Sequence, residues 1–382
     1  MTEKLTRRIV LKFGTNLLTS GQDRLDIDFM SKLVAQVAEL HRQGCEVLIV
    51  TSGAVAAGRQ RLGLAKGSTR ELKGIPLKQV LAAVGQGQLM KTYEELFGHH
   101  QLTVAQALLT RASLIDRAGY LNTRNTLLAL LELGIIGIIN ENDVVAVDEL
   151  EEARFGDNDN LSAMVANLVD ADLLLILTDT GGLYTADPHC HPEAELITEV
   201  REITPSIEAA AAGPQATGAT GGMITKIEAA KLATSSGITV VIASGREVDV
   251  ITRLVRGEAI GTRFLPAGRR ESRVRWMLSG LGTRGRLTVD NGAAQALATQ
   301  HRSLLAAGIK AVAGEFERGD IVDIVDGTGD KLGSGISNYS SAELIRITGA
   351  RSDQITEILG HNYGAEVVHR NNLALFEQQR EV

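Results

Sequence analysis

Short runs of β-branched and other apolar residues alternate with longer stretches of helical periodicity along the first two thirds of the chain. The pattern predicts strands at 7–14, 46–53, 104–109, 134–140, 172–179 and 239–244. Between them it predicts helices at 27–44, 76–100, 120–134, 160–171 and 225–237, with 76–100 forming one helix or two. This alternation is typical of an α/β fold with a parallel sheet covered by helices on both faces. Ligands of such sheets bind beyond the carboxyl ends of the strands, so the strand-to-loop junctions are the candidate sites.

The pattern changes near residue 262, where a connector rich in arginine and containing Pro and Gly begins. Beyond it, short apolar runs at 285–290, 310–314, 320–326 and 342–349 alternate with glycine-rich turns. This predicts short strands in a small β-barrel with one or two short helices. We therefore expect a first domain at 1–262, a linker at 263–275, a second domain at 276–355 and a C-terminal extension at 356–382.

Composition excludes several classes of protein. The 382 residues are 44% hydrophobic and 22% charged with a net charge of −7, which is ordinary for a globular protein and suggests neither nucleic-acid nor membrane binding. The longest apolar run, 127–140, contains Glu132 and is too short to cross a bilayer. The N-terminal segment does not read as a signal peptide, so a cytoplasmic protein is expected. The turn with His189, Cys190 and His191 has no further Cys or His cluster to complete a metal site, so no metal-binding residue is predicted.

Two of the strand-to-loop junctions suggest anion binding. The first carries Lys12, which is costly in a buried strand unless it meets an anion. The alternative is a lysine of an edge strand whose ammonium group reaches solvent. The second junction, TSGAVAAG at 51–58, joins a strand through a glycine to the start of a helix, a common arrangement for anion binding.

The other two junctions are richer in polar groups. The third has two clusters of Asn and Asp, INEND at 139–143 and FGDNDN at 155–160, on either side of an acidic segment. Carboxylates there would suit the ammonium group of a zwitterion, and amides its carboxylate; helix capping explains one such residue but not two clusters. The fourth combines LTDTGGLYTADP at 177–188 with TGGMITK at 220–226, which brings Lys226 to a helix start as in phosphate sites. A surface loop would have the same composition.

Taken in order, VLKFGTN, VLIVTSGAVAAG, INENDVVA, FGDNDNLSA, LTDTGGLYTADP and TGGMITKIEAA resemble the amino acid kinase family, over residues 8–264. Within that family, INEND together with GDNDN resembles the glutamate 5-kinase branch. GEFERGDIVDI and LGSGISNYSSAEL are similar to a PUA domain. The resemblance implies a three-layer sandwich with a mostly parallel sheet, a small β-barrel-like PUA domain, and a homo-oligomer, dimer or tetramer. The acidic stretch 148–152 looks longer than is usual in the family.

The resemblance also implies a reaction and the residues that perform it. The reaction would be ATP-dependent phosphorylation of the γ-carboxylate of L-glutamate to L-glutamyl 5-phosphate, the first step of proline biosynthesis, with proline as feedback inhibitor. Lys12 and Lys226 would stabilise the transferring phosphoryl group, and Asp159 would orient them. Glutamate would be bound by Ser52, Asp143 and Asn158, with Asn140 and Asp157. ATP, with Mg²⁺ bridging its phosphates, would be held by Lys12, Thr178, Asp179, Thr220, Gly221, Gly222, Met223, Ile224, Thr225 and Lys226.

Two alternative functions stay open. One is another carboxylate kinase of the same family, acting on acetylglutamate or aspartate. The other is an RNA-binding protein, because PUA-like domains occur in such proteins. Residues 270–355 carry 11 Lys and Arg against 10 Asp and Glu, a net charge of +1, which is far from the basic surface that RNA binding favours.

Overall fold

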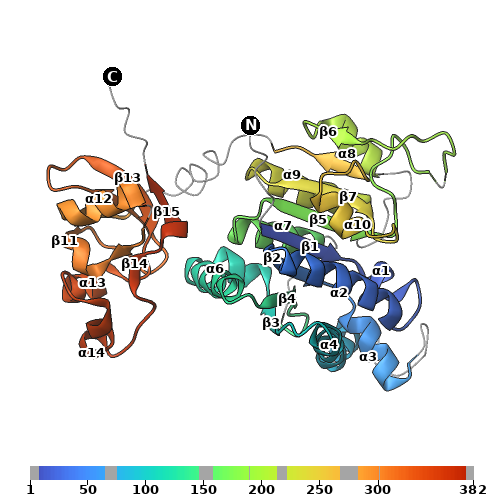
Figure 1. Ribbon diagram of the computed structural model, residues 1–382, viewed down its shortest axis with the longest axis horizontal. Helices are drawn as coiled ribbons and strands as arrows, with labels where there is room; N and C mark the ends of the chain where they lie inside the picture. Colours follow the sequence, from blue (N-terminus) through green and yellow to red (C-terminus); the bar gives the residue numbers. More distant parts are fainter. Residues whose placement is uncertain are drawn as a thin grey trace. The chain divides into compact units, whose positions relative to one another are not determined.

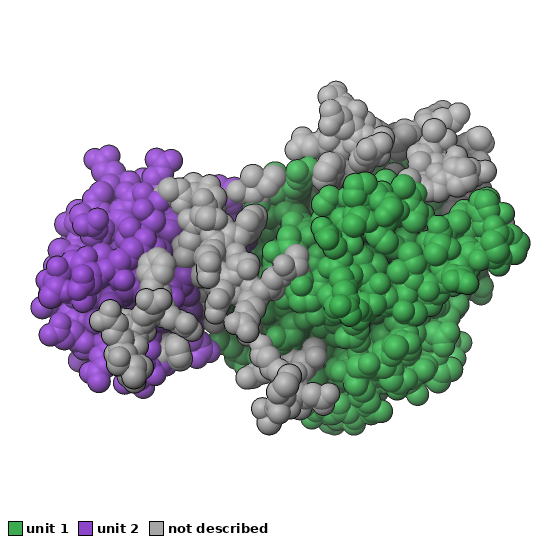
Figure 2. Space-filling view, turned by 90° about the horizontal axis from the view of Figure 1, so that it is seen from above, with its two compact units in different colours: residues 1–114, 123–269 green, residues 115–122, 270–382 purple. Residues whose placement is uncertain are grey.

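The structure, a computed structural model, describes residues 8–64, 75–145, 158–188, 190–212, 222–266, 283–300 and 302–375. The chain divides into two compact units, shown in different colours in Figure 2. Unit 1 comprises residues 1–114 and 123–269, and unit 2 comprises residues 115–122 and 270–382. Most of the predicted linker lies outside the described residues.

Unit 1 is built on an eight-stranded sheet with the order β3-β4-β2-β1-β5-β7-β8-β6 (Figure 1). Its strands are β1 (Arg8–Phe13), β2 (Glu46–Thr51), β3 (Val104–Leu109), β4 (Ile136–Glu141), β5 (Leu173–Thr178), β6 (Glu199–Val200), β7 (Thr239–Ser244) and β8 (Thr262–Phe264). The pairs from β3 to β7 are parallel, and β8 is antiparallel to β7. The predicted α/β fold with a mostly parallel sheet is confirmed. Arg263 and Phe264, expected in the linker, belong to this sheet, and Phe264 is fully buried.

Helices cover both faces of this sheet, which explains why its central strands are mostly apolar and why their polar residues lie toward the strand ends. The helices in this part of the chain are α1 (Thr15–Thr19), α2 (Ile27–Arg42), α3 (Ala54–Leu62), α4 (Ile75–Gly98), α5 (Arg111–Ile115), α6 (Arg117–Glu132), α7 (Asn158–Leu168), α8 (Pro205–Ala212), α9 (Met223–Ser235) and α10 (Val250–Val255). Residues 115–122, which include the start of α6, are assigned to unit 2. The segment predicted as one helix or two is the single helix α4. In the described part of the chain, no helix has the length and apolar character needed to span a membrane.

The alternation of side chains along strand β1 determines the face of the sheet on which Lys12 lies. Ile9, Leu11 and Phe13 belong to a core that also contains residues of α2 and α4. Successive side chains of a strand point to opposite faces. Lys12 therefore points to the other face of the sheet, where α7 packs against β1.

Unit 2 contains a five-stranded sheet with the order β11-β9-β12-β13-β15 and a two-stranded sheet of β10 and β14. Its strands are β9 (Gly285–Val289), β10 (Leu304–Leu305), β11 (Ile309–Ala313), β12 (Ile321–Val325), β13 (Lys331–Ile336), β14 (Glu366–Val368) and β15 (Leu373–Leu375). Its helices include α12 (Asn291–Gln300), α13 (Ser341–Ile347) and α14 (Ile355–Leu359). Strands β14 and β15 lie in the segment set apart above as a C-terminal extension, yet they pair within these sheets.

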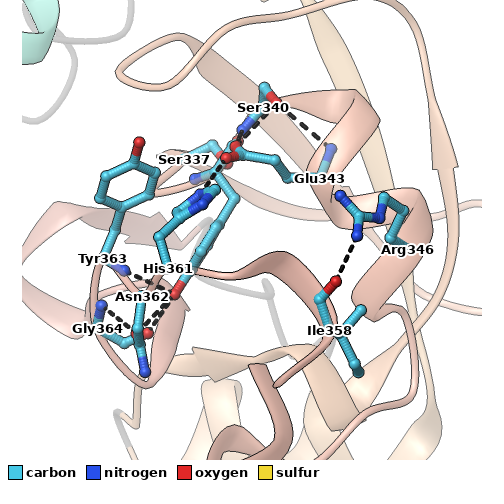
Figure 3. A network of polar contacts seen from close by, with 10 residues as sticks. Ser337, Ser340, Glu343, Arg346, Ile358, His361, Asn362, Tyr363 and Gly364 are labelled. Atoms are coloured by element: carbon cyan, nitrogen blue, oxygen red, sulfur yellow. Dashed lines mark hydrogen bonds and ion pairs between the residues drawn. The ribbon is translucent and has the colours of Figure 1, made fainter. Parts of the chain in front are cut away.

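The prediction of a strand at 342–349 is wrong, because this segment forms helix α13. A capping box starts the helix: the hydroxyl of Ser340 accepts from the backbone N–H of Glu343, whose carboxylate accepts from the N–H of Ser340 at 2.7 Å (Figure 3). The other carboxylate oxygen of Glu343 lies 2.7 Å from Nε2 of His361. These bonds satisfy polar groups that a helix start leaves unpaired, which outweighs the β-branched residues in the segment.

Candidate active site

The four junctions singled out in the sequence meet along one edge of the unit 1 sheet. They follow β1, β2, β4 and β5, which are consecutive neighbours in the order β4-β2-β1-β5. These four strands are parallel, so their carboxyl ends lie at the same edge. This is the position at which open α/β sheets bind ligands.

A cluster of two lysines and one carboxylate lies at this edge. Asp159, in the first turn of α7, is fully buried. Its Oδ1 lies 2.6 Å from Nζ of Lys12, and its Oδ2 lies 3.1 Å from Nζ of Lys226. The lysine side chains are 5% and 8% exposed. Removing charges from water is costly, so three buried charges imply a site built around them, and a carboxylate between two ammonium groups holds both in place.

The hydroxyl of Thr225, the residue before Lys226, fixes the same carboxylate. It lies 3.0 Å from Oδ2 of Asp159 and 2.8 Å from the carbonyl oxygen of Gly222, the residue before α9. The lysine from β1 and the lysine from α9 thus face one carboxylate from α7. An anion entering this cluster would meet two positive groups whose positions are already set.

A network of uncharged side chains lies next to the cluster. Nδ2 of Asn158, the residue before Asp159, donates to Oγ of Ser52 at 2.9 Å and to Oδ1 of Asn140 at 3.1 Å. Nδ2 of Asn140 donates in turn to Oε1 of Gln86 at 2.8 Å. The structure therefore brings together Ser52, Asn140 and Asn158, which the sequence analysis assigned to substrate binding. It adds Gln86 from α4, which no motif in the sequence indicated.

Thr178 and Asp179, which are predicted to bind the nucleotide, lie at the end of β5, on the opposite side of β1 from β2. The hydroxyl of Thr178 donates to Oδ1 of Asp179 at 3.0 Å, and Nδ2 of Asn16 lies 3.3 Å from its Oδ2. Burial raises the pKa of Asp179, but these hydrogen bonds, its own N–H and the charge of Lys226 outweigh burial and hold the pKa below its ordinary value. The carboxylate is thus ionised near neutral pH and can accept hydrogen bonds from a ligand.

Of the remaining predicted site residues, some have a position in the fold and others lie outside the described range. Gly222 precedes α9, which begins with Met223 and Ile224. Asp143 is half-buried in the turn after β4. Asp157, Thr220 and Gly221 lie outside the described residues, as does His189. The assigned roles of all these residues stay predictions.

Comparisons with known proteins agree with this arrangement. The model of the amino acid kinase family matches residues 7–244, and that of the PUA domain matches residues 285–359. A glutamate 5-kinase of Dehalococcoides mccartyi strain CBDB1 is 57% identical over 377 residues, which are 98% of this chain and 100% of that protein. The chain belongs to the glutamate 5-kinases of the amino acid kinase family.

Other glutamate 5-kinases show the same extent of similarity. That of Herpetosiphon aurantiacus is 52% identical over 98% of this chain and 100% of its own length, and that of Moorella thermoacetica is 50% identical over 96% of each. The match therefore includes both units, and the resemblance drawn from the motifs is confirmed for the kinase family and for the PUA domain. The roles of single residues are not decided by these comparisons.

Proposed function

We propose that this chain transfers the γ-phosphoryl group of ATP to the γ-carboxylate of L-glutamate, giving L-glutamyl 5-phosphate and ADP. The observation that carries the proposal is the buried Lys12–Asp159–Lys226 cluster beside the amide network of Asn158. The cluster suits a polyphosphate anion, and the network offers uncharged hydrogen-bonding groups to a polar substrate. The names of the relatives supply the identity of that substrate.

The chemistry needs no general base. A glutamate side chain has an ordinary pKa of about 4.3, so the attacking carboxylate is already ionised near neutral pH. One of its oxygens forms a bond to the γ-phosphorus, while the bond from that phosphorus to the β–γ bridging oxygen breaks and ADP leaves with the electron pair. Catalysis then depends on alignment and on charge stabilisation during the transfer. Lys12 and Lys226, held by Asp159, supply the positive charge.

ATP would enter this site with its metal ion. In the described part of the chain no group of three or more His, Cys, Asp or Glu side chains is placed to hold a metal. Mg²⁺ is commonly bound through substrate phosphates with only one or two carboxylates from the protein. The ionised carboxylate of Asp179 beside the lysine cluster fits a metal that the nucleotide carries. When bound, Mg²⁺ would neutralise phosphate charge alongside the two lysines.

A substrate panel tests the proposal. The acyl phosphate is trapped with hydroxylamine in the presence of ATP and Mg²⁺, with L-glutamate, N-acetylglutamate or L-aspartate as acceptor. We expect product with glutamate only. A preference for either other acceptor would replace the proposed substrate. An RNA-binding function would instead appear as a salt-dependent electrophoretic shift with no acyl phosphate.

We further propose that the activity opens proline synthesis and that proline inhibits it in competition with glutamate. Proline shares the ammonium and carboxylate groups of an α-amino acid, which the groups around Asn140 and Asn158 would bind, but it lacks a γ-carboxylate. Initial rates at several proline concentrations should show a rising apparent KM for glutamate and an unchanged KM for ATP. Competition with ATP, or insensitivity to proline, would contradict this proposal.

A further inference from the structure

The hydrogen bonds around Asn140 fix the orientation of the neighbouring amide groups. The backbone N–H of Glu141 lies 2.9 Å from Oδ1 of Asn140, and a peptide N–H can only donate, so this atom must be the oxygen. The other terminal atom of Asn140 is then a nitrogen that donates, and the atom of Gln86 facing it at 2.8 Å must be Oε1. Nε2 of Gln86 therefore points away from Asn140.

The same reasoning orients Asn158. Its atom at 3.1 Å from Oδ1 of Asn140 must be a donor, Nδ2, so its own Oδ1 is directed elsewhere. Both remaining atoms, Nε2 of Gln86 and Oδ1 of Asn158, are buried and have no hydrogen-bond partner among the described residues. Buried polar atoms are almost always paired in folded proteins, and an exception at a binding site marks a place for a ligand. Here the ligand must supply one acceptor and one donor, as an α-amino acid does.

We infer that Gln86 is a substrate-binding residue whose Nε2 donates to the α-carboxylate of glutamate. The inference rests on the proposed function and extends it to a residue that no motif indicated. The γ-carboxylate must reach the phosphoryl group at the lysine cluster, next to Asn158. Gln86 ends the hydrogen-bonded chain that runs from Asn158 through Asn140, so it meets the opposite end of the substrate.

Close packing of two helices sets the position of Gln86. An added Cβ at Gly85 would lie 1.8 Å from the carbonyl oxygen of Ala54, and one at Gly58 would lie 2.0 Å from the carbonyl oxygen of Leu81. The backbones of α3 and α4 are thus in direct contact. Ala54 follows Ser52 by two residues, so this contact fixes Gln86 relative to the serine of the same network. A rigid donor loses less entropy on binding than a mobile one.

Two substitutions separate substrate binding from support of Asn140. Gln86→Met keeps a similar volume and removes both the donor and the acceptor. Gln86→Glu keeps an oxygen that accepts from Asn140 and replaces the donor by a carboxylate oxygen, which repels a substrate carboxylate. Gln88→Met is the matched control, because residue 88 lies two positions along the same helix and hence on another face. Thermal unfolding with and without ATP establishes that each variant is folded.

We expect the KM for glutamate to rise about 10- to 100-fold in Gln86→Met, the range for a hydrogen bond to a charged group, and further in Gln86→Glu. The KM for ATP and kcat at saturating glutamate should stay within about threefold in both variants. The lost hydrogen bond would hold the substrate equally in the ground state and in the transition state, so its loss raises KM without lowering kcat. The Gln88→Met control should match the wild type.

Two results would overturn the inference. If Gln86→Glu keeps the glutamate KM within about twofold, Gln86 serves only as an acceptor for Asn140. If kcat falls while KM is unchanged, the residue acts at the reacting end of the substrate. Should Gln86→Glu not fold, Gln86→Met still decides against the inference if its glutamate KM stays within about twofold of the wild type, because both the donor and the acceptor are then dispensable for binding. A wild-type protein that forms no glutamyl phosphate would remove the proposed function itself, which is a different outcome from either of these.

Discussion

Replacing Asp159 by asparagine tests whether one buried carboxylate holds the two lysines of the cluster. The change removes a negative charge and almost preserves the shape, leaving Lys12 and Lys226 with 5% and 8% exposure. Removing one partner of a buried ion pair costs about 3–5 kcal/mol. We therefore expect the free energy of unfolding of unit 1 to fall by about 3 kcal/mol or more, which is a large share of the 5–15 kcal/mol typical of a domain.

ATP provides a second readout of the same change. Its phosphates return negative charge to the two lysines, so ATP should stabilise the Asp159→Asn variant by more than it stabilises the wild type. Turnover should nevertheless fall about 100-fold, because the lysines lose the group that aligns them for the transferring phosphoryl group. The KM for glutamate should change little, because the amide network of Asn158 contains no carboxylate from Asp159.

The assay is urea unfolding with and without ATP, combined with initial rates from hydroxylamine trapping. Thr225→Val is the matched control, since it removes a neutral hydroxyl 3.0 Å from the same oxygen of Asp159. That change should cost only about 1 kcal/mol. The reasoning would be refuted if Asp159→Asn lost no more stability than Thr225→Val while turnover stayed within a factor of two.

Two further predictions concern packing and pH. Gly85→Ala should lower the free energy of unfolding by about 3 kcal/mol, because its Cβ would lie 1.8 Å from a carbonyl oxygen of α3. Gly87→Ala, where nothing lies within 4 Å, should instead raise it by about 0.5–1 kcal/mol, and urea unfolding compares the two. In unit 2, burial raises the pKa of Glu343, but hydrogen bonds from Ser340 and His361 outweigh burial and hold it below the ordinary 4.5. That stabilisation is complete above pH 4.5 and is lost as the pH falls through the lower folded-state pKa. The protection of the α13 amides against hydrogen exchange, taken relative to the intrinsic rate at each pH, should therefore fall with acid in the wild type but not in Glu343→Gln.

The sequence was sufficient for the parts of the fold that follow from apolar periodicity. The central strands of the unit 1 sheet are covered on both faces, so they contain continuous apolar runs such as 173–177, every residue of which is buried. Short edge elements carry no such signal: β6 has two residues and β8 has three. The apolar pattern of α13 also fits a strand, because its Ile and Leu residues suit either structure, and the capping box at Ser340 and Glu343 is the signal in the sequence that favours the helix.

The candidate site likewise contains residues that the sequence indicates and one, Gln86, that it does not indicate. Lys12, Asp159 and Lys226 stand out because charged residues at the ends or starts of apolar elements are costly unless they are used. Gln86 lies between two glycines within α4, and Gln88 follows in the same helix. In the sequence, an uncharged amide at this position resembles any half-buried polar residue. Its significance depends on which atoms face each other across β4, α4 and α7, and that information exists only in three dimensions.

Helix α7 joins the two halves of the site. Asn158 and Asp159 are consecutive, and neighbouring residues of a helix point about 100° apart, so one side chain enters the amide network while the next enters the lysine cluster. The far end of the helix is also fixed: the fully buried guanidinium of Arg124 donates to the carbonyl oxygen of Leu168 and lies 2.7 Å from a carboxylate oxygen of Asp170. A helix held at both ends keeps the backbones of Asn158 and Asp159 in a fixed relation to each other. The spacing between the groups proposed to bind glutamate and the lysines proposed to bind the phosphoryl group is therefore set by two adjacent residues of one helix, and transfer between two anions requires such alignment.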